Sequence, residues 1–412
     1  METINSQPNV KHNVLVNLFD GAFFSMGLGF ASFTTILPLF LTNLTESAVL
    51  LGLIPAIHNV GWLLPQLLAA KSMTGMKRYR PAVLFWTLGE RVPFLFLAAL
   101  AFFTAKLAPA TVIAIFFAIL VIQGLSAGIT ANPWQNLIAK VIPPTMRGTF
   151  FGAQASLSNL MLSLGALLAG FILDAKGYPI GFAIVFLICF ISMAISFFGL
   201  AATREEPTED IAPIQTNKDF YKNVVHIWTH DHRFRWFIIS RFIYQFGMMA
   251  SAFFIVYAVK DLGMSVIQAG ALTSVMFVTQ VLSGFLFGRL GDRIGHLMVF
   301  RIGSICLFLA AIVAAFTAQT SWMYLVMILS GMANSVFWTI GIVVGLEFGR
   351  GGNSPVYVGM SNSLIAPAAI LAPLLGGLLA DSMNFKATFL ASAGFALLTL
   401  YILIKYVVPE KE

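Results

Sequence analysis

Long apolar runs alternate with short polar stretches along the whole chain. An α-helix needs about 20 apolar residues to cross the hydrocarbon core of a bilayer, which is about 30 Å thick, and each run reaches that length. Several runs contain Gly or Pro, which spanning helices tolerate when neighbouring groups satisfy the freed backbone atoms. The pattern predicts about twelve spanning helices, at roughly 14–42, 47–70, 82–104, 108–138, 148–173, 179–202, 234–259, 265–288, 297–318, 321–346, 356–382 and 386–407.

The composition predicts a surface that faces lipid. Of the 412 residues, 58% are hydrophobic and 10% are charged, whereas a soluble domain carries about a quarter charged residues. A surface this poor in charge needs an apolar surrounding, so the lipid bilayer is an expected partner. With short loops, the chain has room for about a dozen spanning helices and for no sizeable soluble domain.

The basic residues lie mainly in alternate loops. They gather after the second, fourth and eighth runs and in the polar stretch at 204–233, while the opposite loops carry only Lys106, Lys176, Lys260 and Lys386. Because loops rich in Lys and Arg stay in the cytoplasm, both termini and the central stretch are expected to be cytoplasmic, in a plasma or inner cell membrane. The net charge of +7 follows from this topology, and nucleic acid is not an expected partner.

No enzyme is predicted. The sequence contains no His-Glu-x-x-His motif and no phosphate loop of the Gly-Lys-Ser/Thr type, which argues against ATP-driven pumping by this chain. Cys189 and Cys306 both lie inside apolar runs, so they are expected to be small core residues without a disulfide or a zinc site. We therefore expect no cofactor and no metal.

The polar stretch at 204–233 separates two sets of six runs. Its first half is acidic and contains Pro, which predicts a flexible linker. Its second half places Phe220, Val224, Ile227 and Trp228 among basic residues. This pattern is typical of an amphipathic helix on the cytoplasmic membrane surface, and an ordinary solvated connector is the alternative.

The two sets of runs are related in sequence. The segment "GALLAGFILD" at 165–174 aligns with "APLLGGLLAD" at 372–381, and at the same offset Gly124 meets Gly331. The repeat predicts an all-α membrane protein with two pseudo-symmetric six-helix bundles. The predicted bundles are 1–203 and 234–412, joined by the linker at 204–233. Secondary transporters use such parallel repeats and bind their solute between the halves, and one chain that holds both halves is expected to work as a monomer.

The sequence resembles the major facilitator superfamily over essentially its whole length. The most specific feature is "GRLGDRIG" at 288–295, which fits the Gly-x-x-x-Asp-Arg-x-Gly signature of that family at Gly288, Asp292, Arg293 and Gly295. The resemblance implies the fold of that superfamily, with the first and seventh helices lining a central cavity from opposite halves and the third helix at the periphery.

Other elements of the family are incomplete in this chain. The first-half copy of the signature loop has Thr74 in place of the acid, and Leu120 stands where the element ending in Gln123-Gly124 has an arginine. The Gly-Pro-x-x-Gly-Gly element of the exporters lacks its Pro at Ala166 and its first Gly at Ala372. Export is therefore favoured over uptake only by a small margin.

Four ionisable residues lie well inside the apolar runs. They are the candidates for ion or proton coupling: Asp20, Glu90, Arg91 and Arg241. Each would cost roughly 2.5–3.5 kcal/mol at the centre of a spanning helix, so all four are expected to face protein or water.

The sharpest hypothesis pairs Asp20 with Arg241. In the resembled fold their helices face each other across the cavity, so Asp20 would be the proton-linked acid and Arg241 would lower its pKa or bind an anionic group of the solute. The alternative is that each residue is satisfied within its own half. Glu90 and Arg91 are adjacent and point about 100° apart, which favours a structural network in the first bundle over a direct role. In that network Arg91 replaces the arginine absent at Leu120.

Polar and aromatic residues on other runs are candidates for the cavity wall. His58 could relay protons because imidazole titrates near neutral pH, or it could serve helix packing. The candidate solute contacts are Asn59, Gln123, Tyr244, Gln245, Asn334 and Trp338. The 39 Phe and 17 Met favour apolar cavity walls and an amphipathic solute, although most of them are expected to face lipid or to pack.

The signature loop suggests a cytoplasmic gate. Asp292 is expected at the amino end of a neighbouring helix, near Arg147-Gly148, where the helix dipole favours negative charge. Arg293 is expected to pair with Glu347. Together with Gly288 and Gly295, which allow a close approach and a tight turn, these contacts would latch an outward-facing state. The alternative is a loop that only sets the topology.

The sequence thus predicts a secondary active transporter of a small amphipathic solute, driven by an ion gradient, with protons as the favoured ion. The alternative is a transporter-like receptor or a lipid scramblase without coupled transport.

Overall fold

The computed structural model describes residues 9–73, 75–208, 216–349 and 354–407. In these ranges the regular structure is helical and no strand is found. Twelve helical segments are long and apolar enough to cross a membrane, which confirms the predicted all-α fold. Proline and short breaks divide several of these segments, so the number of separate helices exceeds twelve.

The chain divides into two compact units. Unit 1 comprises residues 1–144 and 157–214, and unit 2 comprises residues 145–156 and 215–412. The sequence-based division places the first boundary near residue 203, whereas the first turns of the fifth span also group with unit 2.

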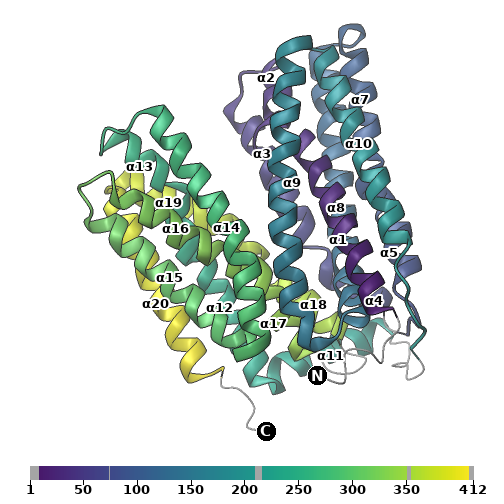
Figure 1. The fold of residues 1–412 in the computed structure, drawn as a ribbon, viewed down its shortest axis with the longest axis vertical. Coiled ribbons are helices and arrows are strands. Elements are labelled where there is room, and N and C mark those ends of the chain that lie inside the picture. The colour runs from purple at the N-terminus through teal and green to yellow at the C-terminus, as the bar shows by residue number, and fades with distance from the viewer. Residues whose placement is uncertain (1–8, 74, 209–215, 350–353, 408–412) are drawn as a thin grey trace. The chain divides into compact units, whose positions relative to one another are not determined.

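Unit 1 contains the first six spans (Figure 1). Its helices are α1 (Val10–Phe30), α2 (Ile36–Thr42), α3 (Ala48–Leu63), α4 (Gln66–Met73), α5 (Arg80–Trp86), α6 (Leu88–Arg91), α7 (Pro93–Phe103), α8 (Pro109–Val141), α9 (Arg147–Lys176, from Leu157 on) and α10 (Ile180–Ala201). The 3-10 turns η1 (Thr104–Lys106) and η2 (Pro144–Met146) connect them.

Unit 2 contains the remaining six spans and the linker helix. Its helices are α11 (Asn217–His230), α12 (His232–Gly247), α13 (Phe254–Lys260), α14 (Val266–Ile294), α15 (His296–Phe316), α16 (Trp322–Ser335), α17 (Gly341–Phe348), α18 (Ser354–Ser363), α19 (Ala366–Ser382) and α20 (Phe385–Lys405). The 3-10 turn η3 (Met248–Ala252) and the π-helical turn η4 (Val336–Ile340) lie within its spans.

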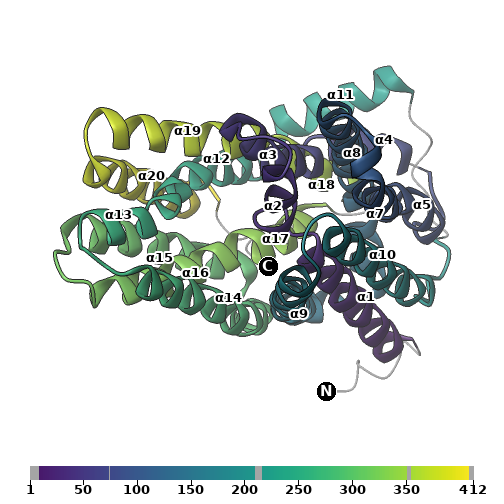
Figure 2. The same cartoon turned by 90° about the horizontal axis from the view of Figure 1, so that it is seen from above.

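The two units repeat the same helix packing. In unit 1, α1 packs on α10, α3 on α8 and α7 on α10. In unit 2 the corresponding pairs are α12 on α20, α14 on α16 and α15 on α20. Figure 2 shows α1 beside α10 and α12 beside α20. The paired glycines of the sequence repeat serve the same crossing. A Cβ on Gly331 would stand 2.7 Å from the Met276 carbonyl, and one on Gly124 would stand 3.1 Å from the Ile57 carbonyl.

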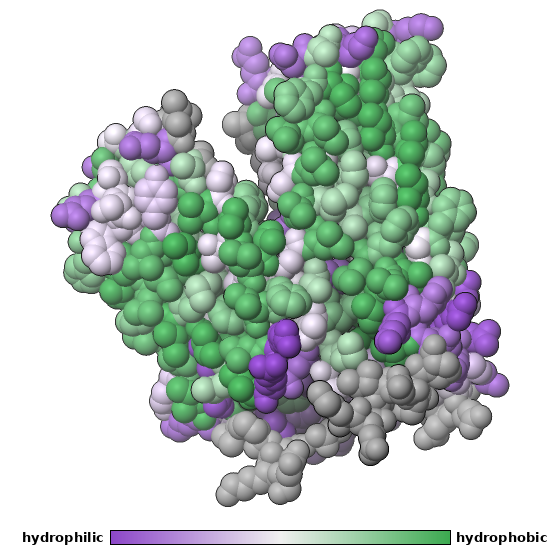
Figure 3. All heavy atoms as spheres, in the orientation of Figure 1, coloured by the Kyte–Doolittle hydropathy of each residue, from purple (hydrophilic) through white to green (hydrophobic). Residues whose placement is uncertain are grey.

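The sides of the helices in each unit carry large apolar residues, while hydrophilic residues gather at their ends (Figure 3). Phe198, Phe316 and Leu378 are 72%, 74% and 67% exposed. Such exposure in water would be costly, at roughly 25 cal/mol per Å² of apolar surface, whereas acyl chains remove that cost. The pattern fits the lipid-facing surface that the composition predicts.

The second half of the linker forms α11. Thr216 caps it by accepting a hydrogen bond from the Asp219 amide at 3.2 Å. Phe220 and Ile227 are buried, while Tyr221 on another face is 52% exposed. Its position on a membrane surface stays a prediction.

Candidate functional site

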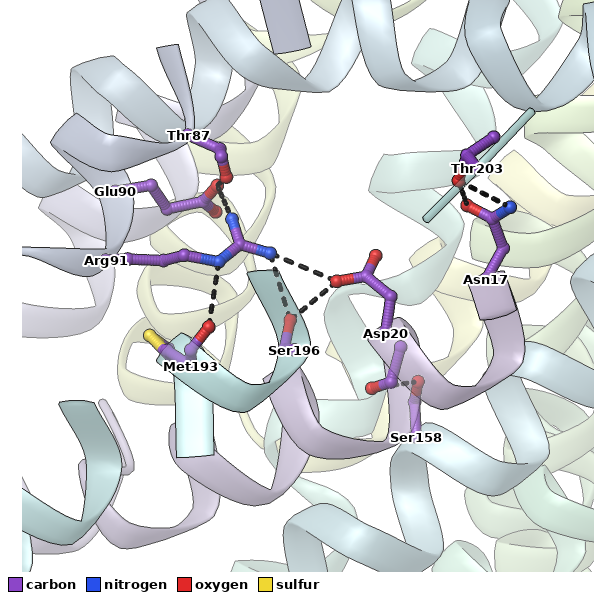
Figure 4. A network of polar contacts seen from close by, with 10 residues as sticks. Asn17, Asp20, Thr87, Glu90, Arg91, Ser158, Met193, Ser196 and Thr203 are labelled. Carbon is purple, nitrogen blue, oxygen red and sulfur yellow. Dashed lines mark hydrogen bonds and ion pairs between the residues drawn. The ribbon is translucent and has the colours of Figure 1, made fainter. Parts of the chain in front are cut away.

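Asp20 lies in a buried ionic cluster of unit 1 (Figure 4). The Arg91 guanidinium donates from Nη2 to Asp20 Oδ1 at 3.1 Å, and the Ser196 hydroxyl donates to the same oxygen at 2.5 Å. Arg91 Nη2 also donates to Ser196 Oγ at 3.0 Å, and Arg91 Nε to the Met193 carbonyl at 3.2 Å. These contacts join α1, α6 and α10 into one polar centre.

Glu90 joins the same cluster. Its carboxylate accepts a hydrogen bond from Thr87 Oγ1 at 3.3 Å and lies 3.9 Å from Arg91 Nη1. Although adjacent helix positions point apart, the long Arg91 side chain reaches both Asp20 and Glu90. The helix is interrupted around them because Pro93 has no amide to donate, and α6 is only four residues long. This arrangement corresponds to the network in the first bundle that the sequence suggests.

A polar stripe on α1 continues from this cluster. Asn13, Asn17 and Asp20 share one helix face, since residues three and four apart are neighbours on a helix. Asn13 exchanges hydrogen bonds of 2.9 and 2.8 Å with the Arg204 backbone, and Asn17 donates to Thr203 Oγ1 at 3.1 Å. The spacing of these three polar residues within an apolar run is a signal in the sequence that could have predicted the stripe.

Arg241 lies in a different environment in unit 2. Its Nη1 donates to the Ser361 carbonyl at 2.9 Å and to Ser361 Oγ at 2.6 Å, with Asn362 Oδ1 at 3.4 Å. The Phe337 ring centre is 5.2 Å from the guanidinium carbon. Arg241 is 1% exposed, and among the described residues it forms no ion pair with a carboxylate.

Asp20 and Arg241 thus each have polar partners inside their own unit, which was the alternative to their pairing. Asp20 already has an arginine partner in Arg91. The approach of Asp20 to Arg241 stays a prediction.

The candidate cavity residues differ in their burial. Tyr244 is fully buried, and its hydroxyl donates to the Ala333 carbonyl at 2.9 Å, so it supports helix packing and not a free solute contact. Gln123 is 1% exposed, and its amide forms no hydrogen bond of good geometry within the described chain. The His58 ring stacks on the Phe33 ring, with 3.9 Å between the two ring centroids. The remaining candidates are exposed or partly exposed: Asn59, Gln245, Asn334 and Trp338.

Asp292 lies at the amino end of α9, where the sequence analysis expected it. Its Oδ1 accepts from the Gly148 amide at 2.8 Å, and its Oδ2 accepts from the amide and the hydroxyl of Thr149 at 2.6 and 2.5 Å. A Cβ on Gly288 would stand 2.1 Å from the Gly148 carbonyl, so glycine is required for this approach. Gly295, with φ of +90°, ends α14.

The expected pair of Arg293 and Glu347 is not what the structure shows. Glu347 Oε1 lies 2.6 Å from Nδ1 of His296, and His296 Nε2 lies 3.1 Å from Asp292 Oδ1. Arg293 is exposed and has no ion pair in the described ranges. His296 begins α15, directly after the turn at Gly295, and its ring contacts both acids, whereas Arg293 in the last turn of α14 is exposed. Arg147 begins α9 and is partly buried.

Glu205 makes a second contact of the same kind, in unit 1. Its two oxygens accept from the amides of Tyr79 and Arg80 at 2.8 and 2.7 Å, and Lys140 Nζ lies 2.9 Å from Oε1. Burial, and then the charge of Glu205, raises the pKa of the Tyr79 phenol. Glu205 lies in the linker predicted at 204–233, and the sequence pattern gave no sign of this role.

One catalytic sequence motif occurs in the chain by its letters alone. Residues 124–128, "GLSAG", match the letters Gly-x-Ser-x-Gly, but they lie inside the continuous helix α8, whereas that motif needs a strand-to-helix turn. Among the described residues, no three His, Cys, Asp or Glu side chains are grouped to hold a metal ion.

Comparisons with known proteins agree with this architecture. The model of the family described as Major Facilitator Superfamily matches residues 21–240 and 237–412. Multidrug resistance protein D of Escherichia coli (strain K12) is 30% identical over 152 residues, which are 35% of this chain and 37% of that protein. The match spans little more than a third of the relative's length.

Solved structures share the fold along nearly the whole chain. The human organic anion transporter MFSD10 (TETRAN) is 16% identical with a TM-score of 0.72, covering 96% of this chain and 100% of that chain. The fucose:proton symporter FucP of Escherichia coli is 13% identical with a TM-score of 0.77, covering 95% of this chain and 97% of that chain. At these identities the likeness shows the fold alone.

Proposed function

We propose a function on the premise that this chain belongs to the Major Facilitator Superfamily. The protein moves a small amphipathic solute across a cell membrane by alternating access, in exchange for protons and in the direction of export. Its termini are cytoplasmic, as the distribution of basic loops indicates.

The observation that carries proton coupling is the unequal charge of the buried cluster in unit 1. Two carboxylates, Asp20 and Glu90, share the single guanidinium of Arg91. With both acids ionised the cluster holds one uncompensated negative charge, and burying such a charge is costly. Uptake of one proton removes that cost, so the cluster is suited to bind a proton from one side of the membrane and release it to the other.

The choice of an amphipathic solute and of export rests on one relative and on the composition of the chain. The relative that matches about a third of this chain is a multidrug resistance protein. A cavity wall drawn from a chain rich in Phe and Met suits a solute with apolar surface.

The contacts of Asp292 support a gate at the cytoplasmic end. The carboxylate accepts backbone hydrogen bonds at the start of α9, where the helix dipole favours negative charge. Beyond Ser156 the same helix continues in unit 1. A contact that holds the start of α9 to α14 therefore acts on a helix shared by both units, and its release would accompany the change of access.

Reconstitution into liposomes tests the proposal. A panel of amphipathic compounds is first screened by thermal shift in detergent, and hits are then followed by counterflow and by a pH dye inside the vesicles. We expect wild-type protein to couple solute movement to proton movement. Asp20→Asn and Glu90→Gln should keep counterflow but lose accumulation driven by a pH gradient, while Asp174→Asn, which alters an exposed acid of unit 1, should behave as wild type.

Two results would overturn the proposal. Undiminished accumulation in both Asp20→Asn and Glu90→Gln would remove the proton-coupling role of the cluster. Binding of a hit without movement of solute or protons would favour a receptor, and movement of lipid alone would favour a scramblase.

A further inference from the structure

The buried cation of unit 2 lacks the compensation found in unit 1. Arg91 lies within ion-pair distance of two carboxylates, whereas Arg241 has only neutral partners among the described residues. The Ser361 carbonyl, near the end of α18, supplies a partial negative charge and not a full one. An isolated buried cation costs several kcal/mol, so this position calls for an anion.

The hydrogen bonds of Arg241 leave one edge of the guanidinium open. Its three hydrogen bonds to Ser361 and Asn362 all use Nη1, while Nε is fully buried and has no hydrogen-bond partner among the described residues. The edge formed by Nε and Nη2 is the one that binds a carboxylate or phosphate through two parallel hydrogen bonds. Ser361 and Asn362 therefore hold the guanidinium from one side and leave its bidentate edge available.

Gly341 leaves this edge free of a side chain. A Cβ on Gly341 would stand 3.3 Å from Nε and Nη2 of Arg241 and 3.3 Å from the Phe300 ring, so any side chain at this position would lie against the edge. A Cβ on Gly345, one turn further along α17, would stand 3.0 Å from Ser361 Oγ. The face of α17 that packs on Arg241 and Ser361 therefore carries no side chain at these two positions.

A second arginine of unit 2, Arg301, also has a buried Nε without a hydrogen-bond partner, but it differs from Arg241 in its exposure and in its carbonyl partners. Arg301 is partly exposed, and its Nη2 donates to the Leu403 and Val407 carbonyls at 2.8 and 2.9 Å. These carbonyls, at and just beyond the end of α20, compensate it through the helix dipole, and part of the side chain is exposed. Arg241 is more deeply buried than Arg301, and it has one carbonyl partner where Arg301 has two.

We propose that Arg241, positioned by Ser361 and flanked by Gly341, is an anion-binding site inside the C-terminal bundle. It takes a small anionic group: a carboxylate, a phosphate or a halide. Assigning that group to the transported solute rests on the proposed transport function, whereas binding of an inorganic anion does not.

The test measures thermal unfolding of the full chain in detergent. Chloride, inorganic phosphate and benzoate are titrated at constant ionic strength, balanced with a bulky sulfonate buffer. We expect at least one probe to raise Tm saturably, by about 2 °C or more. Arg241→Gln should remove the effect, and Gly341→Ala, which keeps the charge but fills the space, should weaken apparent binding at least about ten-fold.

Matched variants serve as controls. Arg301→Gln removes a guanidinium of the same unit, and Gly394→Ala adds a methyl group where no atom lies within 4 Å. Both should keep the wild-type response. Competition between benzoate and chloride would identify the anionic group of an organic solute, while a response to chloride or phosphate alone would identify an inorganic anion.

The absence of saturable stabilisation by every probe would overturn the site, and so would an equal response of wild type, Arg241→Gln and Gly341→Ala. If Arg241→Gln does not fold, Gly341→Ala decides. Anion binding by a protein that moves no solute would refute the transport function and leave the anion site intact. Coupled transport without any response to anions would refute the anion site and leave the transport function intact.

Discussion

The two units of this protein share one helix packing but treat their buried charges in opposite ways. In unit 1, two acids surround one guanidinium, which leaves an excess of negative charge at Asp20, Glu90 and Arg91. In unit 2, the guanidinium of Arg241 is held by neutral groups and keeps an unpartnered Nε. A duplicated scaffold therefore carries two different electrostatic sites, and we propose that the first binds a proton and the second an anion.

The largest effect is expected from removing the shared guanidinium. Arg91→Met leaves Asp20 and Glu90 buried without a cation, and breaking a buried pair from one side costs about 3–5 kcal/mol. The measurement is thermal or denaturant unfolding in detergent at neutral pH. Arg78→Met, which alters an exposed arginine of unit 1, is the control. Equal stability of the two variants would show that the Arg91 guanidinium does not stabilise the two buried acids.

The next effect is rescue inside the same cluster. Adding Asp20→Asn to Arg91→Met removes one of the stranded charges, so the double variant should recover about 0.5–3 kcal/mol relative to additive behaviour. A double-mutant cycle in the same unfolding assay measures this coupling. Strictly additive losses would show that the contact at 3.1 Å carries no interaction energy.

A smaller effect is expected where each unit holds a helix start with a carboxylate. Asp292 holds the start of α9, and Glu205 holds the start of α5. Asp292→Asn and Glu205→Gln each lose a charge near a helix dipole but keep an acceptor, at a cost of about 1–2 kcal/mol.

Only Asp292→Asn should also change the turnover of transport, because α9 continues from unit 2 into unit 1. Counterflow rates of the two variants are compared at equal amounts of folded protein. A slower rate in Asp292→Asn alone would distinguish a carboxylate that acts as a gate from one that only caps a helix. Undiminished turnover in Asp292→Asn would count against the gate.

The smallest effect on stability is expected from Arg241→Gln in a buffer poor in small anions. The substitution removes a buried cation that lacks an opposite charge, so the unfolding free energy should stay within about 1 kcal/mol of wild type or rise above it. Unfolding curves of Arg241→Gln and Arg91→Met, recorded with and without added chloride, measure the difference in unfolding free energy between the two variants. A loss as large as that of Arg91→Met in both buffers would show that Arg241 has a structural partner instead of an exchangeable anion.

Local patterns along the chain were enough to predict the architecture. Apolar runs of spanning length reflect the thickness of the bilayer, and the repeat between 165–174 and 372–381 reflects two bundles with one packing scheme. The signature at 288–295 likewise led to Asp292 at the start of α9, because a helix amino end and a carboxylate attract each other in any such fold.

Tertiary structure decided which charges meet. Arg91, next to Glu90 in sequence, reaches across to Asp20 on α1, and His296 replaces Arg293 as the partner of Glu347. Such pairs depend on the rotation of each helix and on side-chain reach across a packed interface, which periodicity along one helix does not encode. The sequence by itself determined that these ionic groups had to turn inward, because lipid cannot solvate them, and only the packing of the helices chose their partners.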